Sequence, residues 1–140
     1  MEIVIIYSCK LKSVETVAKS MANFTHTHAR KMGDYPSKQT IDLLVVVFSD
    51  TLFRDRELYD FLAQTNRNTV RNVALVNAFY RTNKKMHDVI AYCHQKNLPL
   101  MREHYSWKQS RGFHFSREKE VVDGALLYLA DMIQVIEGYY

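Results

Sequence analysis

Residues Ile3–Ala22 read IVIIYSCKLKSVETVAKSMA and decide the fold. An apolar run from Ile3 to Tyr7 ends abruptly in a polar, lysine-bearing turn, and a helical pattern starts at once. A short, β-branched and nearly continuous apolar run is typical of a strand that is covered on both faces. Ser13 is a good N-cap residue, and the apolar residues after it recur at helical spacing. In α/β proteins a strand–turn–helix unit of this kind often binds phosphate, although this turn has no glycine.

The rest of the chain repeats the alternation of strand and helix. Four further strands are predicted, the first two buried and the last two weaker: Ile41–Phe48, Val73–Phe79, Thr27–Met32 and Leu98–His104. Helical patterns lie at Arg54–Thr65, Lys84–Gln95 and Arg117–Glu137. This alternation indicates a doubly wound α/β domain. We expect a single domain over residues 1–140, a three-layer sandwich whose five-stranded parallel sheet has the order 2-1-3-4-5.

Composition limits the class of protein. The chain has 140 residues, of which 47% are hydrophobic and 24% charged, as in ordinary soluble globular proteins. Its longest wholly apolar stretch, Leu43–Phe48, is too short to cross a bilayer, and no basic region precedes the first apolar run as in a signal peptide. We therefore expect a cytoplasmic protein. The net charge of +4 favours acidic partners, but acidic residues stand among the basic ones, so we expect no nucleic acid and no membrane as partners.

Three stretches resemble the flavodoxin family. Ile3–Ala22 looks like that family's first strand, phosphate loop and first helix, while IDLLVVVFSD and YDFLAQTNRNTVRNVALVNAF look like its third strand, second helix and fourth strand. The sequence Leu-Lys-Ser-Val at residues 11–14 stands where the family has Thr-Gly-Asn-Thr. The resemblance implies FMN as cofactor. Its phosphate would lie against backbone N–H groups at the start of the helix, with the hydroxyls of Ser8 and Ser13 and the ammonium groups of Lys10 and Lys12.

The resemblance also implies that the loops Ser49–Arg54 and Asn77–Asn83, neither of which contains glycine, hold the flavin ring. Phe53, Phe79 and Tyr80 would flank the ring, or would instead pack over the strand ends. Backbone groups of residues 77 and 78 would lie at the edge of the ring. The residues implied for cofactor binding are Ser8, Cys9, Lys10, Leu11, Lys12, Ser13, Val14, Ser49, Asp50, Leu52, Phe53, Asn77, Ala78, Phe79 and Tyr80.

The resemblance therefore implies an electron carrier or accessory flavoprotein that acts with a redox partner, an acidic one given the basic chain. No side chain shows the pattern of a general base or nucleophile with an orienting partner, so we do not expect a stand-alone hydrolase. The alternative is a flavodoxin-fold protein without flavin that serves as a binding or regulatory module. A third reading keeps the phosphate site for another phosphorylated small molecule, bound through Lys10 and Lys12.

Other features leave alternatives open. Cys9 lies just before a helix start beside a lysine, where a thiol becomes reactive, or it is simply a small residue in a turn; Cys93 falls on an apolar helix face. His26 and His28 would share one face of a strand, but no third metal ligand is evident, and we expect no metal. The segment HYSWKQSRGFHF at residues 104–115 is either a surface loop pinned by its aromatic side chains or a cover for a ligand.

Overall fold

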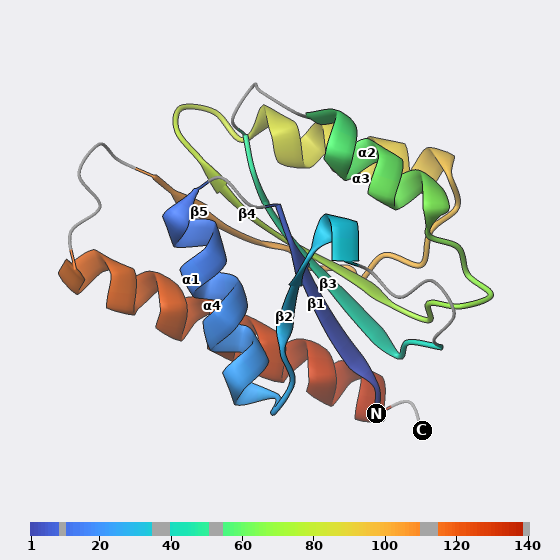
Figure 1. Ribbon diagram of the computed structural model, residues 1–140, viewed down its shortest axis with the longest axis horizontal. Coiled ribbons are helices and arrows are strands. Elements are labelled where there is room, and N and C mark those ends of the chain that lie inside the picture. The colour runs from blue at the N-terminus through green and yellow to red at the C-terminus, as the bar shows by residue number, and fades with distance from the viewer. Residues whose placement is uncertain (9–10, 35–39, 51–54, 110–114, 139–140) are drawn as a thin grey trace.

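The computed structural model describes residues 1–8, 11–34, 40–50, 55–109 and 115–138. Within them, five strands form one parallel sheet in the order β2-β1-β3-β4-β5, with helices on both faces (Figure 1). The strands are β1 Ile3–Tyr7, β2 Ala29–Lys31, β3 Leu43–Ser49, β4 Val73–Phe79 and β5 Tyr105–Lys108. The helices are α1 Lys12–Phe24, α2 Asp55–Gln64, α3 Lys84–Gln95 and α4 Phe115–Gly138, with a 3-10 helix, η1, at Met32–Asp34. The predicted fold class and strand order are confirmed.

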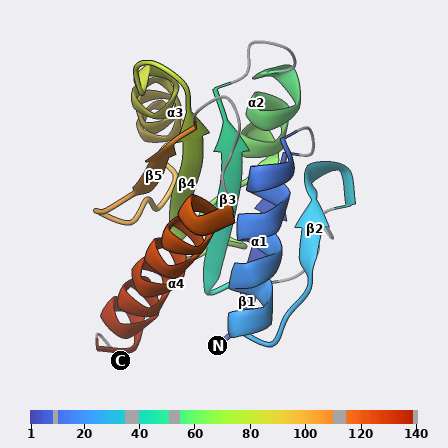
Figure 2. The ribbon, with the colours of Figure 1, turned by 90° about the vertical axis from the view of Figure 1, so that its left-hand side faces the viewer.

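The sheet is the middle of three layers. Helices α1 and α4 cover one face and α2 and α3 the other (Figures 1 and 2). Burial on both faces of the sheet explains why β3 is apolar from Leu43 to Phe48. Leu43, Val45 and Val47 pack in the core under α1 and α4. The residues between them pack in the core under α2 and α3. In the described part of the chain, no helix is long and apolar enough to cross a membrane.

The sheet register places a topological switch beside β1. Strand β1 pairs with β2 along one side and with β3 along the other side. The chain therefore changes the direction in which it adds strands at β1. In open α/β sheets a ligand usually lies outside the carboxyl ends of the strands at such a point. The strands that follow continue the same direction, since β3 pairs β4 and β4 pairs β5 in parallel. Their carboxyl ends therefore share one edge of the sheet.

The predicted position of the last strand, Leu98–His104, is wrong. The fifth strand is β5, Tyr105–Lys108, and Leu100 forms only an isolated bridge with Val73. In β5 the side chains of Tyr105 and Trp107 pack toward α4, while Ser106 between them joins a polar cluster on the other face. β5 stands at the end of the sheet order and is therefore an edge strand. The strand was predicted too early in the chain because the segment before β5 is more apolar at its start.

The histidine prediction is also wrong in its geometry. His26 has a φ of 58° in the turn that follows α1, and His28 comes before β2 begins. They therefore do not share one face of a strand. Among the described residues, no group of three or more metal-ligating side chains is close enough to hold an ion.

Candidate functional site

The candidate site is the edge of the sheet where the carboxyl ends of β1, β3 and β4 meet and α1 begins (Figure 1). Backbone hydrogen bonds extend the ladders past the strand ends. The Ser8 N–H donates to the Val47 carbonyl at 3.0 Å, and the Asp50 N–H donates to the Ala78 carbonyl at 3.1 Å. The first residues of the three loops are thereby held side by side.

The structure brings most of the predicted site residues to this edge. Those that lie on it with exposed or half-exposed side chains are Ser8, Leu11, Lys12, Ser49, Asp50, Phe79 and Tyr80. Those whose side chains are buried are Ser13, Val14, Asn77 and Ala78. The remaining four, Cys9, Lys10, Leu52 and Phe53, lie outside the described residues. A buried residue of this set can offer a ligand only its backbone.

The predicted N-cap role of Ser13 is wrong. The N-cap residue of α1 is Leu11, which has extended dihedral angles and makes no side-chain cap hydrogen bond. Ser13 lies inside the first turn, where its buried hydroxyl donates to the Gln109 Oε1 atom at 3.0 Å. The Trp107 Nε1–H donates to the same oxygen at 3.2 Å. The first turn of α1 is thus tied to β5, and its leading N–H groups have no carbonyl partner within the helix.

The two carboxylate oxygens of Asp50 differ in their hydrogen bonding. Its Oδ2 atom accepts a hydrogen bond from the Tyr80 N–H at 3.0 Å, which clips the loop after β3 to the loop after β4. Its Oδ1 atom is buried and has no hydrogen-bond partner in the described part of the chain. A buried oxygen without a donor destabilises a fold by about 1–3 kcal/mol. A ligand with an N–H group at this position would remove that penalty.

Three polar side chains form a closed ring of hydrogen bonds that holds the loop after β4. The Asn77 Nδ2 atom donates to the Asn83 Oδ1 atom at 2.9 Å, and the Asn83 Nδ2 atom donates to the Ser106 hydroxyl at 2.8 Å. Ser106 completes the ring by donating to the Asn77 Oδ1 atom at 2.6 Å. Asn77 is fully buried, so these partners satisfy a side chain that would otherwise be costly inside the sheet. The ring fixes the start of α3 relative to β4 and β5.

The aromatic side chains of the site differ in accessibility. Tyr80 is 37% exposed and Phe79 is half-buried, so the ring of Tyr80 is available to a planar ligand. Trp107 is buried in the core. It therefore does not cover the site, which was one of the two predictions for residues 104–115. Residues 110–114 of that segment lie outside the described residues.

The charges around the site are mostly basic. Lys12 at the start of α1, Arg81 after β4 and Lys108 at the end of β5 are all exposed. Arg117 donates from its Nη2 atom to the Lys108 carbonyl at 2.8 Å, which ties the first turns of α4 to the same edge. Of the carboxylates nearby, Glu15 forms an ion pair with Lys19 at 2.6 Å, and this partner lowers the pKa of Glu15. These exposed basic side chains would favour an anionic ligand at this edge.

Sequence reasoning missed Asn83, Ser106 and Gln109, which hold the loops of the site. One signal was present, since Ser106 lies between two aromatic residues in an alternating pattern. Gln109 carries no such signal, because its partners come from α1 and β5.

No family model matches the sequence, and no curated protein matches it. Solved structures do match over nearly the whole chain. Flavodoxin 2 from Bacillus cereus is similar with a TM-score of 0.71 and 10% identity, covering 100% of both chains. Flavodoxin 1 from the same organism has a TM-score of 0.70 and 13% identity, covering 96% of this chain and 98% of its own. This chain has the flavodoxin-like fold.

The flavodoxin-like fold also includes proteins with other names. The Trp repressor binding protein from Bacillus subtilis is similar with a TM-score of 0.57 and 10% identity, covering 89% of this chain and 95% of its own. At such identities the likeness concerns the course of the chain alone, because fold does not fix function. The resemblance drawn from the sequence is confirmed at that level, as a divergent flavodoxin-like chain.

Proposed function

We propose that this flavodoxin-like chain is a cytoplasmic FMN-binding protein that transfers electrons with an acidic redox partner. The observation that carries the proposal is the buried, unpaired Oδ1 atom of Asp50 at the switch point. The isoalloxazine ring has one N–H group and a planar face, and Asp50 and Tyr80 offer an acceptor and an exposed aromatic ring at the same edge. The similarity of the fold to flavodoxins supports the choice of cofactor.

The start of α1 would hold the phosphate. Its leading backbone N–H groups and the positive end of the helix dipole attract an anion without help from particular side chains. Lys12 adds a cation in the first turn, and Ser8 adds a hydroxyl beside it. Ser13 does not contribute its side chain, because that hydroxyl donates to Gln109. When bound, FMN supplies one- and two-electron transfer.

The chain's own residues would set the surroundings of the ring. The Tyr80–Asp50 hydrogen bond fixes the loops after β3 and β4 relative to each other. The hydrogen bonds among Asn77, Asn83 and Ser106 hold the loop after β4 in place. The exposed cations at this edge would draw an acidic redox partner toward the flavin and make its association depend on salt. The proposed partners include neither nucleic acid nor membrane.

A titration of the purified protein with FMN, followed by flavin fluorescence, tests the proposal. We expect saturable quenching at micromolar FMN or below, which is about −8 kcal/mol or better. Replacing Asp50 with Asn removes the charge and leaves a single side-chain oxygen, which cannot accept from both the Tyr80 N–H and a ligand N–H in their separate positions. A hydrogen bond to a charged group contributes about 1.5–3 kcal/mol. Asp50→Asn should therefore weaken FMN binding by about tenfold or more. Asp131→Asn removes an exposed carboxylate from α4 and should bind FMN as the wild type does.

The second candidate is the binding or regulatory module without flavin. It is favoured by the hydrogen bonds that already occupy the Ser13 hydroxyl and the Ala78 carbonyl, two groups that a cofactor would otherwise use. A folded protein that ignores FMN even at millimolar concentration would contradict the flavoprotein proposal and leave this one. Equal FMN affinities for Asp50→Asn and the wild type would contradict the role given to Asp50.

A further inference from the structure

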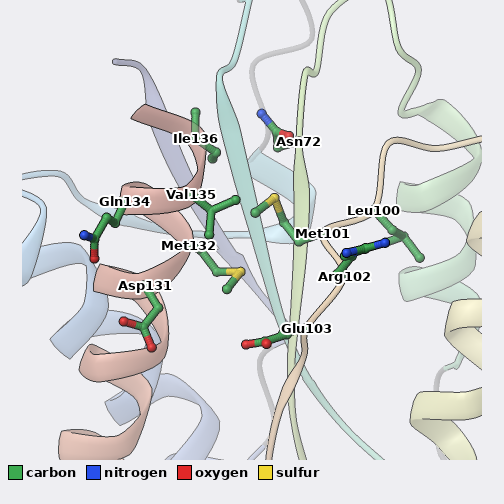
Figure 3. A pocket seen from close by; sticks show the side chains of 10 residues that line it. All are labelled: Asn72, Leu100, Met101, Arg102, Glu103, Asp131, Met132, Gln134, Val135 and Ile136. Carbon is green, nitrogen blue, oxygen red and sulfur yellow. The ribbon is translucent and has the colours of Figure 1, made fainter. Parts of the chain in front are cut away.

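A groove lies at the opposite end of the molecule from the candidate flavin site. It runs between the C-terminal half of α4 and the segment Leu100–Glu103, at the amino ends of β4 and β5 (Figure 3). Its volume is about 750 Å³. We call it the α4 groove. None of the residues proposed for FMN lines it, so it is a separate feature of the surface.

The floor of the α4 groove is apolar and rich in methionine. Met101 and Met132 face each other across it, and both side chains are buried (Figure 3). Methionine is flexible and polarisable, so it adapts to apolar side chains of different shapes. Val135, at the wall, is 43% exposed, and Leu127, two turns earlier on α4, is 69% exposed. Large apolar side chains with such exposure, next to a groove, are typical of a surface that another molecule covers.

Two exposed apolar side chains flank a carboxylate along the helix. Leu127, Asp131 and Val135 follow one another at intervals of four residues, so they lie along one flank of α4. That flank is about 12 Å long at 1.5 Å per residue. A stripe of this length, continuous with a groove, fits a helical segment of two to three turns lying alongside α4 better than it fits a compact small molecule.

The α4 groove is negatively charged although the chain as a whole carries +4. Glu103 and Asp131 stand on opposite walls, and neither has an ion-pair or hydrogen-bond partner for its carboxylate among the described residues (Figure 3). No lysine or arginine occurs between Glu120 and the end of α4, so the negative end of the helix dipole is not compensated. Arg102 is the one cation that lines the groove in the described part of the chain, which leaves a net negative charge.

From these observations we infer that the α4 groove docks a basic, amphipathic helical segment of a partner protein. The apolar side of that segment lies on Met101 and Met132 and against Leu127 and Val135. Its lysine or arginine residues lie near the carboxylates of residues 103 and 131 and the final carbonyls of α4. Charge complementarity selects the partner, and the adaptable floor tolerates variation in its apolar residues. The inference does not depend on FMN, because the two surfaces share no residue.

The probe is a synthetic 14-residue peptide of leucine and lysine in an amphipathic helical pattern, compared with the same peptide carrying glutamate in place of lysine. Binding is measured by fluorescence anisotropy and located by NMR amide shifts. The lysine peptide should bind and shift Met101–Glu103 and the C-terminal half of α4, and the glutamate peptide should not bind. Glu103→Gln combined with Asp131→Asn should weaken binding about three- to tenfold, as expected for two exposed charge pairs.

Two more variants distinguish binding in the α4 groove from nonspecific attraction of the peptide to negative charge. Leu127→Ser removes an exposed apolar side chain, which keeps the core intact and should weaken binding about tenfold. Glu57→Gln with Asp60→Asn removes two carboxylates from α2, on the opposite face of the sheet, and should bind the lysine peptide as the wild type does.

The inference would be overturned if the lysine peptide did not bind or if the glutamate peptide bound equally well. Three further results would also overturn it. The first is equal weakening by the α2 double variant, and the second is a set of amide shifts that lies outside the α4 groove. The third is self-association of the wild type, seen by sedimentation and abolished by Leu127→Ser, which would show that a second copy of the chain covers the groove. Failure of FMN to bind would not count against it, and failure of the peptide to bind would not count against FMN.

Discussion

Gly124 on α4 lies against Tyr105 on β5, and replacing it with alanine tests the packing of the last strand. A Cβ atom at Gly124 would lie 2.5 Å from the Tyr105 Oη atom, closer than real contacts allow, and 3.0 Å from its Cζ atom. The tyrosine has little room to move. Its hydroxyl donates to the Val121 carbonyl at 2.9 Å, and its ring centroid lies 6.1 Å from that of Tyr128 in a stacked arrangement.

Two effects of Gly124→Ala oppose each other. Alanine stabilises a helix interior by about 1 kcal/mol relative to glycine. Forcing a methyl group into a packed site costs about 1–3 kcal/mol, and losing the Tyr105–Val121 hydrogen bond costs about 1 kcal/mol more. The steric effect is the larger one. We therefore expect the free energy of unfolding to fall by about 1–3 kcal/mol.

Urea unfolding followed by far-ultraviolet circular dichroism measures this change. The midpoint should fall by roughly 1 M at an unchanged slope, because slopes for small proteins are about 1–3 kcal/mol per M. Gly33→Ala is the matched control, since no atom lies within 4 Å of a Cβ there, and it should change stability by less than about 0.5 kcal/mol. In a Tyr105→Phe background, Gly124→Ala should cost less, because the nearest atom is gone. A Gly124→Ala protein as stable as the wild type would refute the reasoning.

Three further predictions concern one buried and two half-buried side chains. Burial raises the pKa of the Cys93 thiol to about 12. In a Cys9→Ser protein, Cys93 should therefore resist Ellman's reagent at pH 8 until urea unfolds the chain. Rapid reaction of the native protein would contradict this. Burial lowers the pKa of His104 below its usual 6.5, so the unfolded state binds more protons than the native state. Stability should therefore fall as the pH drops below about 6.5, and a His104→Gln protein measured at pH 5 and pH 7.5 should lose less of it. Ser106→Ala opens the polar ring around Asn77 and should lower the free energy of unfolding by about 1–3 kcal/mol in the same urea assay, and an unchanged midpoint would contradict it.

The sheet and its order were predictable because buried parallel strands have a strong sequence pattern. β1 and β4 begin and end where the apolar runs do, and α3 matches its helical pattern at both ends. β5 was not predictable in the same way. Its four residues alternate aromatic and polar side chains. The strand was instead predicted at Leu98–His104, because that segment is more apolar at its start.

The site was predictable only in its location. Strand order puts the three loops at one edge, but it does not say which side chains pair there. The Ser13–Gln109 hydrogen bond joins residues 96 positions apart, and a serine near a helix start is expected to cap that helix. The same limit applies to Asp50, because an unpaired oxygen is a property of the packed structure and not of the sequence around it.

The packing of α4 against α1 brings together the two ends of the chain. Their side chains share one core, which includes Val14 and Met21 of α1 and Ala125 and Leu129 of α4. During synthesis α1 is made well before α4, yet that side of the sheet stays open to water until α4 has left the ribosome. The face under α2 and α3 has no such delay, because its helices precede β5. A nascent chain should therefore close one side of its sheet first and expose the other, with its row of β-branched residues, to chaperones.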